Sequence, residues 1–375
     1  YSRTVKSTRA IRIITSLSLG VVLISAFSWL GLGQISGAID RIDVFGALDS
    51  RPDKPNKALN YLLVGSDTRE GLTKEQRKLL RVGSTATAAG SRSDTMLLVH
   101  ISKSRDKATL ISIPRDSLVT IPEHVSSLDK TKIIPAAQGK INAAFAFGGA
   151  PLLIETIENE TGVRIDHYIE IGFAGFAGMV DALGGIEICT KRDIDDPGSH
   201  LVLPAGVHTL DGVESLKYVR TRDFDGMGDL GRMQRQQEFM GALLRKVTST
   251  GVLLNPIKLV SFFNAAIATV TTDSELNKSD LLTLLKQMKN LSPSKVRTLT
   301  IPLSDTNARV PGVGAVVIWD PVLAPELFNR LREDLPLIDE VTPSPSSSST
   351  AKATTTVIDK FKTRTADENP CGALK

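Results

Sequence analysis

The sequence is poor in the residues and motifs that mark several large enzyme classes. It has only two cysteines and five histidines among 375 residues, and it contains no paired CxxC, HExxH, P-loop or GxSxG motif. A zinc hydrolase, a P-loop nucleotidase and a serine hydrolase with a nucleophile elbow are therefore unsupported. Aromatic residues make up 5% of the chain and the net charge is only +4. Nucleic-acid binding needs clustered basic charge or stacking aromatics, so we expect no nucleic-acid partner.

Charge is also missing from a long stretch near the N-terminus. Residues 13–33 are uncharged, and Arg3, Lys6, Arg9 and Arg12 precede them. As a helix with a rise of about 1.5 Å per residue, this stretch spans a hydrocarbon core of roughly 30 Å, which predicts a transmembrane signal anchor. The basic residues predict that the tail at 1–12 is cytoplasmic and that all later residues are extracellular. A cleaved signal peptide is the alternative, but no convincing small-x-small cleavage site follows the run.

The two cysteines, Cys189 and Cys371, both fall on the predicted outer side of the membrane. In an oxidising compartment a pair this far apart in sequence can form a disulfide, and this is the pairing that we expect. Two unpaired thiols are the alternative.

The rest of the chain alternates between apolar strand-like and helix-like segments, which predicts a single α/β/α domain with a central mixed β-sheet. Strands are expected at 58–65, 94–102, 107–113, 165–172 and 186–190, and near 296–302 and 315–319. Helices are expected at 140–162 (two in succession), 173–185, 210–220, 229–247, 256–269 and 279–290. The composition predicts a spacer at 34–57, the domain at 58–338, a Pro/Ser/Thr-rich linker at 339–356 that cannot bury a core, and a tail at 357–375.

Four short clusters of arginine and aspartate lie after apolar strands or around helix ends: GSDTR (65–69), SRSDT (91–95), IPRD (113–116) and YVRTRDFDGMGDLGRMQRQQ (218–237). Any one such pair is more often a loop cap or a salt bridge. Asp67 and Asp94, however, flank two predicted strands that could be neighbours, and two carboxylates on one site suit Mg²⁺. Arginine grips phosphate oxygens bidentately, so the combination predicts phosphoryl transfer. The arginines concerned are Arg92, Arg115, Arg220, Arg222 and Arg232.

The predicted helix at 229–247 adds a geometric argument. Arg232 and Gln236 are four residues apart near its start, so they share a face close to the free backbone N–H groups and the positive end of the helix dipole. Arg235, three residues from Arg232, lies at the margin of that face, where it is equally compatible with a solvated charge or a salt bridge.

Six segments, in order, resemble the motifs of the LytR-CpsA-Psr family of membrane-anchored cell-wall glycopolymer ligases: LLVGSDTR, SRSDTMLLVHI, ISIPRDS, KINAAFAFGGA, LDGVESLKYVRTR and DLGRMQRQQ. The resemblance is close over about 58–250 and weaker to about 338. It implies an α/β/α core that holds a polyprenyl pyrophosphate in a deep apolar pocket. It also implies Mg²⁺-dependent (or Mn²⁺-dependent) transfer of a glycopolymer from that carrier to a cell-envelope acceptor through a phosphodiester bond.

The same resemblance implies roles for individual residues. Asp67 and Asp94 are expected to hold the metal. The pyrophosphate is expected to be bound by Arg92, Arg115, Arg220, Arg222, Arg232 and Gln236. Arg115 and Arg232 are the expected catalytic stabilisers of phosphate charge, and Asp116 or Asp229 would orient these arginines or act as general base, with Asp116 placed among the catalytic residues.

A polyprenyl chain needs a long dry groove, because each buried CH₂ contributes about 0.8 kcal/mol. Candidates for its lining, each equally compatible with ordinary core packing, are Phe145, Phe147, Leu152, Leu153, Ile157, Phe173, Phe176 and Met179. Two features depart from the family pattern. A polar insertion at 70–90 is expected to form a flap beside the site. The sequence also ends soon after the linker, where many actinobacterial relatives continue into another domain, and a Cys189–Cys371 bridge would fasten this tail to the core.

The expected function is therefore that of a membrane-anchored phosphotransferase with peptidoglycan or a surface glycoprotein as acceptor. Two alternatives remain open. Water could replace the acceptor, which would make the protein a polyprenyl-pyrophosphate pyrophosphatase, or the domain could be a non-enzymatic envelope regulator or lipid-binding module. Cytoplasmic DNA binding conflicts with the predicted topology, which leaves only about a dozen residues inside the cell.

Overall fold

The computed structural model describes residues 40–48, 50–82, 93–249, 270–277, 280, 291–341, 356–368 and 371. The predicted membrane span at 13–33, the predicted helix at 256–269 and all but one residue of the predicted helix at 279–290 lie outside this part of the chain. Among the described helices, none combines the length and the hydrophobicity needed to cross a bilayer.

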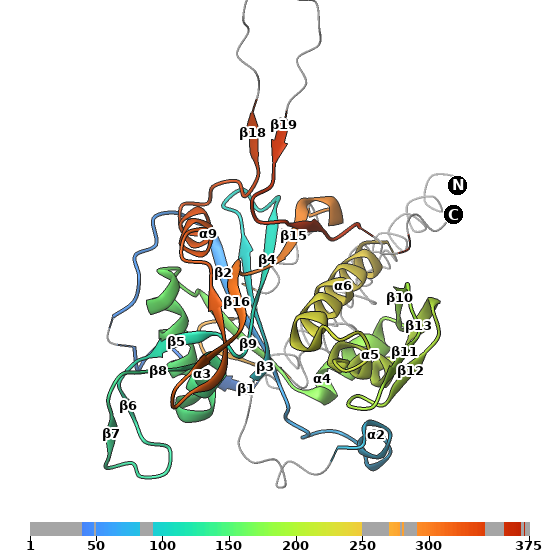
Figure 1. The fold of residues 1–375 in the computed structure, drawn as a ribbon, viewed down its shortest axis with the longest axis horizontal. Coiled ribbons are helices and arrows are strands. Elements are labelled where there is room, and N and C mark those ends of the chain that lie inside the picture. Colours follow the sequence, from blue (N-terminus) through green and yellow to red (C-terminus); the bar gives the residue numbers. More distant parts are fainter. Residues whose placement is uncertain are drawn as a thin grey trace, which may run out of the picture.

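An eight-stranded mixed sheet forms the centre of the fold (Figure 1). In spatial order its strands are β1 (Asp40–Ile42), β14 (Val270–Asp273), β9 (His167–Ile171), β2 (Leu59–Ser66), β3 (Ser93–Ile101), β4 (Ala108–Ile113), β15 (Val296–Thr300) and β20 (Arg364–Thr365). β2 pairs parallel with β9 and antiparallel with β3, and β3 pairs antiparallel with β4. The predicted α/β class and mixed sheet are therefore confirmed, with five of the expected strands in it.

Alternation along the central strands separates the two faces of the sheet. On β2, Leu62 and Val64 belong to the hydrophobic core under α3 (Ile141–Thr161) and α9 (Leu323–Arg332), whereas Leu63 points to the opposite face. On β3, Leu98 faces α3 and Leu97 the other side. Both faces are covered, which explains why these strands are almost continuously apolar.

α3 confirms the prediction of two consecutive helices at 140–162. Gly149 interrupts it with φ 66° and ψ −154°, a backbone conformation that an L side chain rarely adopts, and Pro151 starts the second part. Leu153 and Ile157 are fully buried in the core beneath it.

The opposite face of the sheet is covered by α4 (Phe173–Ala182), α5 (Gly212–Arg220) and α6 (Gly228–Ser249). Asp211 is the N-cap of α5, as predicted. It accepts the N–H of Glu214 at 2.8 Å, and the Glu214 side chain accepts the N–H of Asp211 at 3.2 Å. A Cβ at Gly212 would lie 2.3 Å from the carbonyl oxygen of Ala177, so glycine permits the close approach of α4 and α5.

The remaining described elements are short. The paired strands are β5 (Leu118–Ile121) with β8 (Ala137–Lys140), β6 (His124–Val125) with β7 (Ile133–Ile134), β10 (Ile186–Thr190) with β13 (Gly206–Leu210), β11 (Ile194–Asp196) with β12 (Leu201–Leu203), β16 (Leu303–Val310) with β17 (Gly314–Trp319), and β18 (Asp339–Val341) with β19 (Thr356–Ile358). A 3₁₀ turn, η2, covers Pro293–Lys295.

The insertion at 70–90 begins with a helix. α2 (Lys74–Leu80) has a capping box between Thr73 and Gln76, and Leu72 and Leu80 are buried in the same core cluster as α4, α5 and α6. The first half of the expected flap is thus packed against the domain, and residues 83–90 lie outside the described part.

Both ends of the described chain join the sheet. β1 lies within the predicted spacer, and β20 lies within the predicted C-terminal tail, where it pairs with β15. The folded unit therefore extends beyond 58–338 on both sides. Cys189 on β10 and Cys371 lie together, with their Cα atoms 6.0 Å apart, a spacing typical of a disulfide.

Candidate active site

The strand directions bring three of the sequence clusters to one edge of the sheet. β2 and β4 run in the same direction with antiparallel β3 between them, so the ends of β2 and β4 and the start of β3 coincide. Asp67 follows β2, Arg115 follows β4, and Asp94 is the second residue of β3. Asp94 and Arg115 are 27 and 48 residues from Asp67 in the sequence, and the topology places all three at the same end of these strands.

The pairing register of β2 and β3 shifts by one residue at Asp94. Gly65 lies opposite Thr95 and Ser66 opposite Ser93, which leaves Asp94 as the extra residue of its strand. Within the described residues, no group of three or more His, Cys, Asp or Glu side chains is arranged to hold a metal. Arg92 lies outside the described residues.

Asp229, in the first turn of α6, is the common partner of three predicted arginines. Its Oδ1 lies 2.7 Å from Nη2 of Arg232, 3.6 Å from Nε of Arg115 and 3.9 Å from Nε of Arg222. One carboxylate therefore holds three guanidinium groups from three elements in one place. Guanidinium groups gathered in this way suit a polyanion, because each can bind phosphate oxygens with two parallel N–H groups.

Asp116 lies next to this cluster. Its Oδ1 accepts a hydrogen bond from Nζ of Lys140 at 2.8 Å, and its Oδ2 lies 3.6 Å from Nε of Arg115. With 27% of its side chain exposed, this carboxylate is accessible to a substrate. Lys140, just before α3, was not among the predicted site residues, although it begins one of the six motif segments.

A buried aspartate on β11 positions the loop that carries Arg222. Asp196 is 1% exposed, and its side chain accepts the backbone N–H groups of Arg222 at 2.5 Å, Asp223 at 2.7 Å and Ser199 at 2.6 Å. Burial alone would raise the pKa of Asp196, but these three hydrogen bonds hold the pKa below its ordinary value. The only sequence signal for this role is the turn-rich segment DIDDPGSH, which is too common to identify it.

The predicted pair on α6 lies inward. Arg232 is 4% exposed and Gln236 8% exposed. The Gln236 side-chain amide donates to Oγ1 of Thr95 at 2.8 Å and to the carbonyl of Val219 at 3.2 Å, so it ties α6 to β3 and to the end of α5. Arg220, at that end of α5, lies over the ring of Phe173 at 5.1 Å.

An apolar cavity of about 380 Å³ opens beside these polar groups. Its apolar lining comes from β2, β3, α4, α5 and α6. The lining residues include Leu63, Val64, Leu97, Ile171, Phe173, Phe176, Met179, Leu216, Val219, Phe239, Met240 and Leu243. Arg220, Arg222, Arg232 and Gln236 line it as well. The cavity is therefore amphipathic, with its positive charge supplied by the predicted arginines, while Asp223, which was not predicted as a site residue, adds a carboxylate.

Part of the predicted apolar lining is wrong. Phe173, Phe176 and Met179 line the cavity, but the candidates on α3 do not, because α3 packs on the opposite face of the sheet. Phe145, Leu152, Leu153 and Ile157 lie in that other core, and Phe147 is exposed and stacks on His124 at 5.6 Å. Hydrophobicity identified both groups but could not distinguish the faces of the sheet.

Of the two alternatives for Arg235, a solvated charge or a salt bridge, the structure shows the salt bridge. Its Nη1 lies 2.6 Å from Oδ2 of Asp225, its Nη2 donates to the carbonyl of Thr221 at 2.7 Å, and its guanidinium lies over the ring of Phe224 at 4.8 Å. With 6% exposure it is a buried side chain that fixes the α5–α6 turn.

Comparison with known proteins bears on this arrangement. A family model described as the LytR_cpsA_psr family matches residues 36–320. Over 273 residues the chain is 39% identical to the probable cell wall biosynthesis protein LcpB of Corynebacterium glutamicum, covering 73% of this chain and 61% of LcpB. It is 27% identical over 330 residues to the polyisoprenyl-teichoic acid–peptidoglycan teichoic acid transferase TagU of Oceanobacillus iheyensis, covering 84% and 89% of the two chains.

Solved structures share the fold. A structure of TagT bound to LIIa-WTA superposes with a TM-score of 0.57 at 26% sequence identity, covering 79% of this chain and 99% of TagT. The chain spans about three fifths of the length of the corynebacterial relatives that it matches.

Proposed function

The chain belongs to the LytR-CpsA-Psr family, and we propose that it is a membrane-anchored phosphotransferase that moves a glycopolymer from a polyprenyl-pyrophosphate carrier onto a cell-envelope acceptor. The product is a phosphodiester between the glycopolymer and either peptidoglycan or a surface glycoprotein. Relatives named as teichoic acid transferases and as cell wall biosynthesis proteins support this proposal.

One observation carries the proposal most directly. A cluster of arginines around Asp229 adjoins a cavity that is otherwise apolar. A polyprenyl pyrophosphate likewise consists of an apolar chain and a charged headgroup. Burial of the chain contributes about 0.8 kcal/mol for each CH₂. The headgroup oxygens can accept two parallel hydrogen bonds from each arginine. Arg232 and Gln236 line this cavity from α6, so they place a charged group and an amide beside the apolar lining.

The carboxylates at the sheet edge support a metal requirement. We propose that Asp67 and Asp94 hold Mg²⁺ or Mn²⁺, since strand register brings both residues to the edge beside Arg115 and carboxylate oxygens are the preferred ligands of these ions. When bound, the ion would neutralise charge on the pyrophosphate oxygens.

The reaction follows from these positions. An acceptor hydroxyl oxygen forms a bond to the sugar-proximal phosphorus, the bridging P–O bond breaks, and polyprenyl phosphate leaves. Arg115 and Arg232 stabilise the charge on the transferred phosphate, while Arg92, Arg220, Arg222 and Gln236 bind the remaining headgroup. Asp116 accepts the hydroxyl proton, because it lies near two cations, Lys140 and Arg115, whereas Asp229 is engaged by three arginines.

The cellular setting completes the proposal. Residues 13–33 anchor the chain, the domain lies outside the cell, and Cys189 forms a disulfide with Cys371 in that oxidising compartment.

The experiment uses the purified full chain in detergent with a polyprenyl-pyrophosphate-linked oligosaccharide and a peptidoglycan acceptor. We expect release of polyprenyl phosphate and a phosphodiester-linked product with Mg²⁺, and loss of both with EDTA. Asp67→Asn should weaken the apparent Mg²⁺ affinity, and Arg115→Ala should lower turnover at saturating metal. Turnover that survives EDTA and Arg115→Ala alike would overturn these roles, and donor cleavage with water as the sole acceptor would indicate a pyrophosphatase instead.

A further inference from the structure

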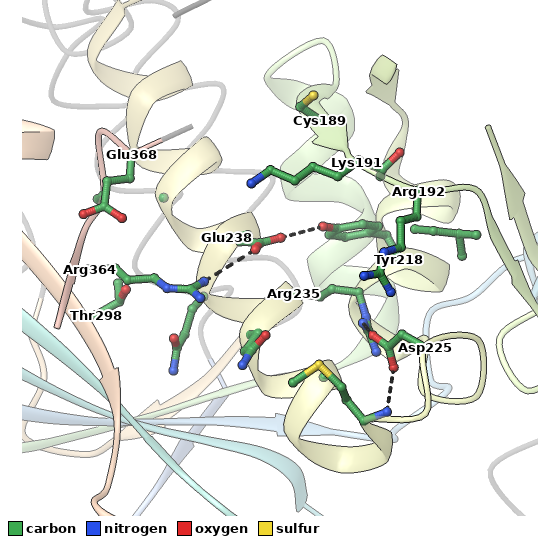
Figure 2. Close-up of a pocket in the computed structure, with 18 of the residues that line it drawn as sticks. Cys189, Lys191, Arg192, Tyr218, Asp225, Arg235, Glu238, Thr298, Arg364 and Glu368 are labelled. Carbon is green, nitrogen blue, oxygen red and sulfur yellow. Dashed lines mark hydrogen bonds and ion pairs between the residues drawn. The ribbon is translucent and has the colours of Figure 1, made fainter. Parts of the chain in front are cut away.

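A second hollow, of about 560 Å³, lies against the opposite face of α6 from the apolar cavity (Figure 2). Its walls are the turn after β10 with Lys191 and Arg192, and the C-terminal strand β20 with Arg364 and the following Glu368. Between them lies the α6 face that runs from Gly231 to Arg245. We call this hollow the lateral cleft.

The centre of the lateral cleft is a polar array. The Tyr218 hydroxyl donates to Oε2 of Glu238 at 3.1 Å, and Nη1 of Arg364 lies 3.6 Å from Oε1 of Glu238. Figure 2 shows Glu238 between these two partners in the middle of the cleft. Glu238 keeps 29% of its side chain exposed and Arg364 keeps 47%. Acceptor and donor groups are therefore both open to a ligand while their positions are constrained.

The charges of the lateral cleft differ from those of the arginine cluster around Asp229. Arg235 is paired with Asp225, Arg364 lies beside Glu238, and Nη1 of Arg245 donates to the backbone carbonyl of Glu368 at 3.2 Å. Lys191 and Arg192 add further basic groups, so the cleft presents acidic and basic side chains and a tyrosine hydroxyl side by side. A ligand whose hydroxyls both donate and accept fits such paired donors and acceptors, and sugars have this chemistry.

The lateral cleft and the apolar cavity are lined by neighbouring residues at the start of α6. Gly231 lines the cleft and Arg232 lines the apolar cavity, and the same division separates Arg235 from Gln236. In the preceding turn, Met227 lines the cleft while Arg222 lines the cavity. A long ligand in the cleft can therefore present a terminal hydroxyl at the arginine cluster from the side that the lipid does not occupy.

One wall of the cleft comes from outside the region that the family model matches. That match ends at residue 320, whereas Arg364 and Glu368 follow it. The segment is held in place because β20 pairs with β15, the Ala366 N–H donates to Val296, and the carbonyl of Ala366 would lie 3.1 Å from a Cβ at Gly241. This wall is a feature of the chain itself, beyond the matched family core.

We propose that the lateral cleft binds the glycan strand of the acceptor, with Glu238 and Arg364 as its recognition residues. This inference rests on the proposed transferase function and specifies a saccharide, and not a polypeptide, as the acceptor. The bound sugar supplies the hydroxyl whose oxygen bonds to the sugar-proximal phosphorus. Polyprenyl phosphate leaves with the electrons of the broken P–O bond, and Asp116 receives the hydroxyl proton.

The first test measures binding without any donor. A soluble, uncrosslinked glycan fragment of peptidoglycan is titrated calorimetrically into the full chain in detergent. We expect saturable binding that weakens about tenfold in Glu238→Gln and in Arg364→Ala, because each removes a hydrogen-bonding group that involves charge. Arg309→Ala, at an exposed arginine on β16, is the matched control and should bind as the unaltered chain does. Thermal melting of each variant separates lost binding from lost folding.

The second test measures turnover. With lipid-linked donor and the same fragment, Glu238→Gln should raise the KM for the acceptor about tenfold and lower the ratio of transfer to donor hydrolysis. Folded variants that bind and use the fragment normally would overturn the proposal. It would also be overturned if Glu238→Gln impaired transfer to a polypeptide acceptor but not to the glycan fragment. If the unaltered chain cleaves no donor but still binds the fragment through Glu238, the proposed function fails while the saccharide site stands.

Discussion

The two faces of helix α6 border two hollows whose charged side chains are arranged differently. On one face Arg232 and Gln236 join an apolar cavity, and one carboxylate, Asp229, is shared among three arginines. On the other face Arg235 has its own carboxylate, Asp225, and Glu238 has its own arginine, Arg364. Arginines gathered on a shared carboxylate suit the pyrophosphate headgroup, and neighbouring acidic and basic groups suit a polyhydroxylated ligand.

Arg232 and Arg235 show how the partners of a buried arginine differ between the two faces. Arg232 and Arg235 are three residues apart and almost equally buried, at 4% and 6% exposure. Arg235 bonds Asp225 and the carbonyl of Thr221 within the loop and so contributes to stability. Arg232 shares Asp229 with two other arginines and lines the apolar cavity, where we expect the headgroup to bind. The following predictions test this contrast.

The largest expected effect is on the cavity face. Arg232→Ala should lower the kcat/KM for cleavage of the lipid-linked donor by about 10²–10³-fold, because the variant loses a preoriented charge at the transferred phosphate. The measurement is release of polyprenyl phosphate, with Arg309→Ala as control. A loss of less than about threefold would remove the distinction between the two faces.

The tail that forms one wall of the lateral cleft should depend on the cysteine pair. Cys371→Ser should lower the free energy of unfolding by about 2–5 kcal/mol, since the bridge closes a loop of 182 residues. Chemical denaturation with and without reductant checks this. Reductant should shift the unaltered chain to the stability of Cys371→Ser and leave the variant unchanged. If reductant leaves the unaltered chain at its original stability, the cysteines are not paired.

Arg235→Ala should act on stability where Arg232→Ala acts on catalysis. We expect a loss of about 2 kcal/mol, because Asp225 and the carbonyl of Thr221 lose their buried partner. Urea denaturation gives the free energy, and donor cleavage is measured at a temperature where the variant is folded. A folded Arg235→Ala that is as inactive as Arg232→Ala would contradict the assignment.

The smallest effects are on pH dependence, where the two faces should have opposite signs. The pKa of Asp196 is lowered in the fold, so its contribution to stability is present above its ordinary pKa of 3.8 and is lost as pH falls through the folded value. Burial raises the pKa of Glu238, against the opposing effects of Tyr218 and Arg364. Its contribution is therefore greatest below the ordinary value of 4.5 and is lost as pH rises through the folded value.

Urea unfolding across a pH series tests these signs in two variants. The stability deficit of Asp196→Asn should shrink in acid. Relative to the unaltered chain, Glu238→Gln should gain stability as pH rises above 4.5. Parallel pH profiles for the two variants would refute the contrast.

Much of the site was predictable because its residues lie in short motifs at strand and helix ends. Asp67, Asp94 and Arg115 follow or begin apolar strands, and parallel and antiparallel pairing of those strands brings such ends together. Arg232 and Gln236 were predictable from helical spacing. Asp196 was not, because its role depends on backbone N–H groups of a loop 26 residues away. Nothing in the local sequence records such a contact.

The sequence by itself determined the α/β class, the order of the central elements and the residue types at the candidate active site, because periodicity and motif spacing are local properties of the chain. Only the tertiary structure decided which face each residue serves. It placed Phe145 of α3 in the core away from the cavity, separated Arg235 from Arg232, and added the strand β20 to the sheet and to the wall of the lateral cleft. These outcomes depend on contacts between segments far apart in sequence, and hydrophobicity or charge alone does not specify the partner.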